Sequence, residues 1–287
     1  MTASQVPAKP LLLGGRFELG GTLTNRGRFR VCEGYDTREG RKVVLKMTHV
    51  SGEDAFDTNL LRLQREAVVL WCVRDEHIVR LIDAGAFEGG YFLALEHLEG
   101  PTLDDTLRHV KILDVRTAAS VMLCVLAGLS VLHRAGIIHR DIKPGNIMLG
   151  MGGVRIIDFD LATCCARIGR RAKRITEHGI VIGTPSHMAP EQCQGYEDQD
   201  ARVDLYACGV VLYEMLVGKG PYPSGGKPRQ MLLRHVHAKP ESFDHAAPNG
   251  NIPQALQDVV YRALAKRRED RFQTADDMRA AILAALS

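Results

Sequence analysis

The 287-residue sequence lacks several features that would place it in a specialised class of protein. No signal-peptide hydrophobic region occurs in Met1–Pro10, and the longest apolar run, Ala118–Leu132, is shorter than a bilayer span. The seven cysteines have no regular spacing, which predicts reduced thiols instead of a disulfide framework. The formal net charge of +3 is too small to indicate nucleic-acid binding. These absences predict a soluble, cytoplasmic protein that binds neither nucleic acid nor a membrane.

Motifs for several common ligand sites are also missing. There is no HExxH, no zinc-like Cys/His spacing and no GxxxxGK[ST], so neither a structural metal nor a P-loop is expected. The glycine-rich stretch Gly150–Gly153 precedes an expected strand instead of a helix, which argues against a dinucleotide-binding turn. Hydrophobic residues make up 45% and charged residues 25% of the chain. These values are ordinary for a globular protein that forms one large domain or two lobes.

Strand patterns dominate the first hundred residues, interrupted by one helical pattern at about 57–73. The expected strands are Phe17–Leu23, Phe29–Tyr35, Lys42–Met47, Ile78–Ile82 and Tyr91–Glu96. After Gly100 and Pro101 the pattern becomes helical, and Thr102 with the acids that follow it predicts a capped helix start. The later expected helices are Asp114–Arg134, Ala201–Val217 and two that begin at Pro253 and Thr274.

The order of these elements predicts an α+β fold with two lobes. Residues 1–15 are rich in proline and are expected to form a flexible leader. A small antiparallel β lobe with one main helix is expected over about 16–96, and a larger helical lobe over about 102–287, with a hinge at about 96–101.

One polar stretch, His139–Asn146, stands between apolar runs and contains an acid, an amide, two cations and a histidine. A hydrophobic core does not require this mixture. Asp141 can take up a proton, and Lys143 can neutralise an anion. Asn146 can ligate a hard cation through its carbonyl oxygen.

The residues after this stretch predict where a second oxygen ligand lies. Ile147–Leu149 and Val154–Ile157 read as short strands joined by a glycine turn. Pairing them as a hairpin places Asn146 beside Asp158, a few ångströms from Asp141. The sequence therefore predicts a metal–phosphate site next to an acid.

Taken in order, these motifs resemble those of protein kinases, of the eukaryotic-like Ser/Thr type found in bacteria, over roughly residues 16–286. The matching segments are Val43–Lys46, Glu66, Glu96–Leu98, His139–Asn146, Asp158–Asp160, Ala189–Glu191, Asp204 and Arg271. The resemblance implies a bilobal kinase domain over 16–287. It also implies transfer of the γ-phosphate of ATP to Ser/Thr hydroxyls of protein substrates, which include the protein itself.

The resemblance implies a role for each matching residue. Asp141 would accept the proton of the substrate hydroxyl, and Lys143 would screen the γ-phosphate. Asn146 and Asp158 would hold Mg²⁺, with Mn²⁺ as the alternative metal. The nucleotide-binding residues implied are Leu23, Val31, Lys46 with its partner Glu66, Glu96 and Leu98, with Leu95 at the gatekeeper position.

Regulation and structural support are implied in the same way. Arg140 beside the catalytic acid is typical of kinases that are switched on by phosphorylation of the activation segment. Thr176 is the expected phosphate acceptor, whereas Thr184 is expected to order the substrate site. The residues with an implied structural role are Asp204, which would brace the 139–146 loop, and the pair Glu191 and Arg271.

The sequence departs from the family pattern at two places. The three glycines of the nucleotide loop fall on Thr24, Arg26 and Phe29, with only Gly27 nearby, although close approach to phosphates favours glycine. Asp160 stands where the magnesium motif has glycine. It gives up glycine's freedom at positive φ and is either an extra metal-directed carboxylate or a tolerated residue facing solvent.

These departures leave a second class open, a pseudokinase or ATP-binding scaffold that transfers nothing. The polar residues that carry the chemistry are all present, which favours an active enzyme. A further open question is the basic run Arg167–Arg174. It reads either as a solvated loop or as a landing site for a phosphate or an acidic substrate.

Overall fold

The computed structural model describes residues 12–24, 29–48, 53–164, 184–223, 225, 227–247 and 250–287. Its contacts divide the chain into two compact units. Unit 1 holds the described residues up to Trp71 together with Arg80–His97, and unit 2 holds Cys72–Val79 and Leu98–Ser287. The boundary at His97 falls within the predicted hinge, whereas the segment Cys72–Val79 belongs with the second unit.

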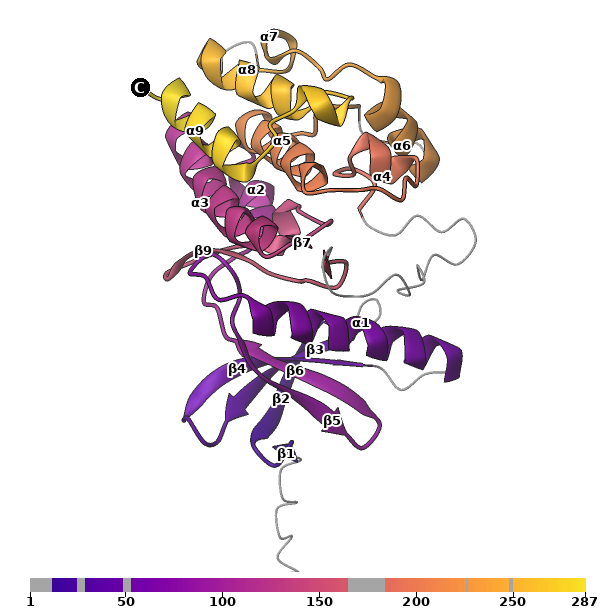
Figure 1. The fold of residues 1–287 in the computed structure, drawn as a ribbon. Coiled ribbons are helices and arrows are strands. Elements are labelled where there is room, and N and C mark those ends of the chain that lie inside the picture. Colours follow the sequence, from indigo (N-terminus) through magenta and orange to yellow (C-terminus); the bar gives the residue numbers. More distant parts are fainter. Residues whose placement is uncertain are drawn as a thin grey trace, which may run out of the picture. The chain divides into compact units, whose positions relative to one another are not determined.

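Unit 1 is an antiparallel sheet with one helix (Figure 1). Its elements are β1 (Leu12–Leu13), β2 (Phe17–Thr24), β3 (Phe29–Asp36), β4 (Arg41–Thr48), α1 (Glu53–Cys72), β5 (Leu81–Phe87) and β6 (Gly90–Glu96). The strand order is β1-β2-β3-β4-β6-β5. The strand predicted at Ile78–Ile82 was wrong in its position, because Ile78 forms an isolated bridge to Ile156 of unit 2 and the strand begins at Leu81. The helix begins at Glu53 instead of near residue 57.

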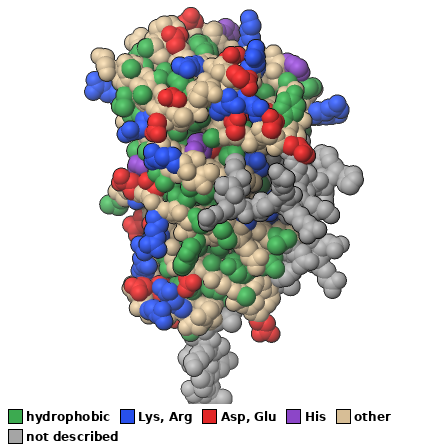
Figure 2. All heavy atoms as spheres, viewed as in Figure 1, with side chains coloured by type: hydrophobic (Ala, Val, Ile, Leu, Met, Phe, Trp, Pro, Cys, Tyr) green, Lys and Arg blue, Asp and Glu red, His purple; other side chains and the backbone are tan. Residues whose placement is uncertain are grey.

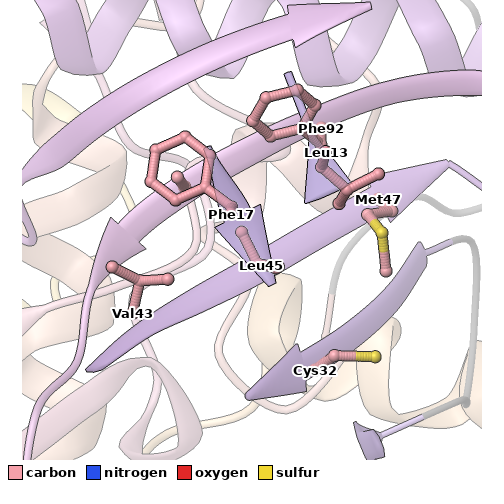
Figure 3. Packing of buried hydrophobic residues seen from close by; sticks show 8 residues of the cluster. Leu13, Phe17, Cys32, Val43, Leu45, Met47 and Phe92 are labelled. Carbon is pink, nitrogen blue, oxygen red and sulfur yellow. The ribbon is translucent and has the colours of Figure 1, made fainter. Parts of the chain in front are cut away.

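Alternating apolar side chains give the sheet one buried face. The core cluster consists of Leu13, Phe17, Cys32, Val43, Leu45, Met47, Phe92 and Ala94 (Figure 3). The rings of Phe17 and Phe92 meet edge to face with centroids 5.8 Å apart, a favoured aromatic geometry. Gly34 belongs to this packing because a Cβ there would lie 2.6 Å from a methyl group of Leu45. The cluster thus fixes β3 against β4, the two strands that carry the candidate nucleotide residues Val31 and Lys46.

Unit 2 is mainly helical, with short strand pairs (Figure 1). Its elements are α2 (Leu103–Val110), α3 (Val115–Arg134), β7 (Ile137–Ile138), η1 (Pro144–Asn146), β8 (Ile147–Gly150), β9 (Gly153–Ile156), β10 (Thr163–Cys164), α4 (Pro190–Cys193), α5 (Arg202–Val217), α6 (Pro228–His237), α7 (Phe243–Ala246), α8 (Gln254–Ala263), η2 (Arg268–Asp270) and α9 (Ala275–Ala285). The helix start predicted at Thr102 is confirmed, because Thr102 and Asp105 form a capping box.

The most apolar helices lie at the centre of unit 2. The helix α5 is buried at nearly every position, as expected for a helix that is hydrophobic all round. The helix α3 packs against α5 and α9. Among the described residues, α3 alone is long and apolar enough to span a bilayer, but 56% of its most apolar window is buried inside the protein. The expected apolar run thus lies in a longer helix, which packs as a core helix of unit 2.

The surface of unit 2 carries charges of both signs. On the face shown in Figure 2, Lys and Arg side chains are interspersed with Asp and Glu side chains. Arg268 lies 2.6 Å from Asp198, and Arg202 lies 2.6 Å from Asp200. Each pair joins a largely covered arginine to a more exposed aspartate, and ion pairs with an exposed partner contribute little to stability.

Candidate active site

The hairpin predicted after the 139–146 loop is confirmed. Strands β8 and β9 pair with Ile147 opposite Ile156. The register continues beyond the strands, because the backbone N–H of Ile157 donates to the carbonyl of Asn146 at 2.9 Å. This bond places Asn146 next to the residue that precedes Asp158. The two predicted oxygen ligands therefore lie at neighbouring positions of adjacent chain segments.

Asp204 anchors the 139–146 loop from the buried helix α5. Its carboxylate accepts hydrogen bonds from the backbone N–H groups of His139 at 2.9 Å and Arg140 at 2.8 Å. His133 Nε2 lies 2.8 Å from the same carboxylate. Burial alone would raise the pKa of Asp204, but the hydrogen bond and charge of His133 hold this pKa below its usual value. An ionised Asp204 can therefore hold the loop in one conformation.

Two residues of this region adopt a backbone conformation that is costly for side chains other than glycine. Arg140 has φ of 68° and Asp158 has φ of 63°. Such strain persists only where surrounding contacts impose it, and it concentrates at functional sites. For Arg140, the hydrogen bond to Asp204 and a second one from the Gln192 side chain to the Arg140 carbonyl at 3.1 Å supply those contacts. Arg140 directly precedes the predicted catalytic acid Asp141, and Asp158 is a predicted metal ligand, so both strained residues lie at the predicted metal–phosphate site.

His139 supports the loop from inside the core. Its ring is fully buried and meets the Phe159 ring edge to face at 4.8 Å. Burial lowers the pKa of His139, so the ring is neutral and one nitrogen can accept a hydrogen bond. The backbone N–H of Asp141 donates to His139 Nδ1 at 3.3 Å. The histidine thus helps to orient the predicted catalytic acid.

The carboxylate of Asp141 is surrounded by side-chain donors. Lys143 Nζ lies 2.5 Å from Asp141 Oδ2, and Asn146 Nδ2 donates to the same oxygen at 3.1 Å. Asn146 Nδ2 also donates to the Asp141 backbone carbonyl at 2.8 Å. Lys143 Nζ donates to Thr184 Oγ1 at 3.0 Å. The structure thus brings four of the predicted residues of unit 2 together: the acid, the cation, the amide and the threonine.

The donor chemistry fits a hard divalent cation. The Asn146 amide oxygen and the Asp158 carboxylate oxygens are the ligand types that Mg²⁺ prefers, with substrate phosphates and water completing its coordination. Within the described residues no group of three or more His, Cys, Asp or Glu side chains could hold a metal ion.

The backbone conformation of Asp160 differs from the one that the family pattern predicts for this position. Its φ is not positive, since the left-handed residue of this motif is Asp158, so position 160 does not need the freedom of glycine. The residue is half-buried and its Oδ1 atom is covered, so its side chain is only partly open to solvent.

Replacing Asp160 with glycine is therefore expected to keep phosphate transfer and to raise the magnesium concentration needed for half-maximal rate severalfold. The physical reason is the loss of a half-buried carboxylate two residues from the predicted metal ligand Asp158. Magnesium titration of the transfer rate measures the shift, with the exposed Asp258→Gly protein as control. A titration identical to that of the wild type would remove any metal-directed role for Asp160.

The candidate phosphate-binding residue of unit 1, Lys46, is part of a buried ion pair. Lys46 Nζ on β4 donates to Glu66 Oε2 on α1 at 2.7 Å, and the two side chains are 9% and 1% exposed. The ammonium group also lies over the ring of Phe29 at 4.9 Å from its centroid. The sequence motif predicted the lysine–glutamate pair. It did not predict the aromatic contact, which depends on the register between β3 and β4.

The other predicted nucleotide residues occupy the strands around this pair. Leu23 is the penultimate residue of β2 and is 54% exposed, whereas Val31 of β3 lies opposite Lys46 of β4. Leu95 is buried in β6 beside Glu96, whose backbone N–H donates to the backbone carbonyl of Arg80 at 2.9 Å. Leu98 lies beyond the strand and is half-buried. No contact in the structure tests the nucleotide-binding role of these residues, which stays a prediction.

A second buried ion pair lies in unit 2. Arg271 is fully buried and makes a bidentate pair with Glu191, at 2.7 Å and 2.8 Å. Thr176, the basic run Arg167–Arg174 and Gly27 lie outside the described residues. Two residues that hold the loop, His133 and Gln192, were missed. No local pattern marks either one, because each acts through a contact that is distant in the sequence.

Comparison with known proteins identifies the family that this geometry belongs to. The family model described as "Protein kinase domain" matches residues 26–281. The chain belongs to the protein kinase family. A probable serine/threonine-protein kinase PknB of Bifidobacterium longum is 35% identical over 95% of this chain and 40% of its own length. The serine/threonine-protein kinase PknB of Mycobacterium tuberculosis is 34% identical over 94% of this chain and 43% of its own length.

The family match confirms the predicted fold class. An antiparallel β unit and a helical unit are the two parts of the kinase fold. The chain spans about two fifths of the length of the curated relatives that it matches. The likeness therefore concerns only that part of each relative.

Proposed function

We propose that this protein is an ATP-dependent serine/threonine protein kinase. The observation that carries the proposal is the arrangement around Asp141, whose carboxylate lies 2.5 Å from Lys143 Nζ and 3.1 Å from Asn146 Nδ2. A carboxylate, a cation and an oxygen ligand gathered on one loop provide what phosphate transfer to a hydroxyl needs. The relatives' designation as serine/threonine-protein kinases supports the same class of acceptor.

The proposed roles follow from the loose transition state of phosphate transfer, in which positioning and charge compensation matter most. Asp141 orients the substrate hydroxyl and takes up its proton. Lys143 compensates the charge of the transferred phosphate. Its hydrogen bond to Thr184 holds the cation beside the acid.

Nucleotide binding is proposed for unit 1, where Glu66 fixes the direction of the Lys46 ammonium toward the phosphates. Asn146 and Asp158 would hold a magnesium ion, which when bound neutralises phosphate charge. Phosphorylation of the activation segment at Thr176, with Arg140 as the receiver of the phosphate, is the proposed switch. An arginine gains charge-assisted hydrogen bonds to such a phosphate.

The test is transfer of radiolabel from ATP to a generic basic protein and to the protein itself. Label in the γ-phosphate should appear on serine and threonine when magnesium is present and should not appear with excess chelator. Label in the α-phosphate should not be transferred, which separates phosphate transfer from nucleotidyl transfer. Equal background labelling with and without magnesium would contradict the proposal and leave the scaffold alternative.

A further inference from the structure

The first residue of β3 stands where the family pattern has a glycine. Phe29 aligns with the third glycine of the nucleotide loop, and its side chain is 7% exposed. In the β3–β4 pair, Phe29 lies opposite Thr48 and Val31 lies opposite Lys46. Phe29 and Lys46 are therefore diagonal neighbours on one face of the sheet, a spacing that an aromatic side chain can bridge.

The ring of Phe29 contacts the head group of the candidate phosphate ligand. Lys46 Nζ is 4.9 Å from the ring centroid and 2.7 Å from Glu66 Oε2. A desolvated ammonium is attracted to the negative face of an aromatic ring. With only 9% of the lysine side chain exposed, the ammonium is held between a carboxylate and an aromatic face.

A phosphate group that binds Lys46 needs the same ammonium. A glycine at position 29 would leave room beside Nζ for phosphate oxygens. The phenyl ring covers part of the ammonium with its negative face, so a phosphate oxygen that binds there must displace this contact. We infer that Phe29 competes with the nucleotide phosphates for Lys46 and thereby limits the affinity of this kinase for ATP.

The inference rests on the proposed function, because it takes Lys46 as the phosphate ligand. One expected effect distinguishes this competition from a site that binds every ligand weakly. The competition acts on the phosphates and not on the base, so it lowers the affinity for ATP and ADP and leaves the affinity for adenosine unaffected.

The test compares the dissociation constants of ATP, ADP and adenosine, measured by calorimetry in magnesium buffer. Phe29→Leu keeps apolar bulk and removes the aromatic face, so it should tighten ATP and ADP binding by about 2- to 30-fold. Phe29→Gly should tighten them at least as much. The matched control is Phe87→Leu, since Phe87 packs on Phe92 in the core cluster, and it should leave nucleotide affinity unchanged.

A further variant keeps the test possible if Phe29→Leu and Phe29→Gly do not fold. Pentafluorophenylalanine at position 29 keeps the ring shape and reverses the charge distribution of its face, so it should also tighten ATP. Unchanged or weaker ATP and ADP binding in the folded variants, with normal adenosine binding, would overturn the inference and assign Phe29 the role of orienting Lys46. Absence of ATP, ADP and adenosine binding in every protein would instead overturn the proposed function, and the inference with it.

Discussion

Replacing Asp141 with asparagine is expected to lower the rate of phosphate transfer by about 10²–10⁴-fold, the range for loss of a general base. Asparagine has nearly the same shape but cannot take up the proton of the substrate hydroxyl. It also loses the negative charge that holds Lys143 Nζ at 2.5 Å. The effect should appear in kcat, because the proposed phosphate ligand Lys46 is unchanged and the KM for ATP should stay close to that of the wild type.

The measurement is the steady-state rate of γ-phosphate transfer, with the thermal unfolding midpoint recorded for each protein. The matched control is Asp258→Asn, an isosteric change of an exposed aspartate on α8 whose side chain contacts Gln254. This control should retain the wild-type rate. A folded Asp141→Asn protein with an unreduced rate would remove Asp141 from its proposed role as proton acceptor.

Sequence reasoning succeeded where chemistry and structure are local. The 139–146 loop contains its polar groups within a few residues, and a glycine turn fixes the hairpin that follows, so both could be predicted before any tertiary contact was known. The strand near residue 80 was misplaced because its start depends on Ile78, which bridges to Ile156 far along the chain. The pattern of apolar residues alone does not predict that contact.

Among the site residues, too, features set by local sequence were predicted and features set by long-range contacts were not. The pair of Lys46 and Glu66 follows from the family motif, whereas the position of the Phe29 ring over Lys46 follows from strand register. At Asp160, the family pattern predicted a glycine-like backbone, but the strained residue is Asp158. Tertiary contacts decide which residue of such a short segment has a positive φ, so the sequence pattern alone does not identify it.

Replacing Arg271 with methionine is expected to lower the free energy of unfolding by about 3–5 kcal/mol, the cost of leaving a buried charge without its partner. The guanidinium is fully buried, and hydrogen bonds occupy all five of its N–H donors. They go to both Glu191 oxygens and to the backbone carbonyls of Ala265, Lys266 and Arg202. Methionine fills similar space but leaves Glu191, itself 5% exposed, and three carbonyls unsatisfied.

The loss should be visible as a lower midpoint in urea unfolding, followed by the circular dichroism of the helices. Arg271→Lys should recover part of the stability at most, because an ammonium cannot reproduce the planar fork of an arginine. The matched control is Arg267→Met, four residues earlier, where the arginine side chain is 77% exposed. Removing that exposed charge should leave the midpoint within experimental error.

The double variant Glu191→Met with Arg271→Met separates two explanations of the loss. If the cost comes from an uncompensated carboxylate, removing that carboxylate as well should restore a large part of the stability, so the two changes are far from additive. If the cost comes only from the unsatisfied carbonyls, the double variant should be no more stable than Arg271→Met. The structure predicts the first outcome, because burial makes the unpaired charge of Glu191 more costly than neutral carbonyls that can turn toward water.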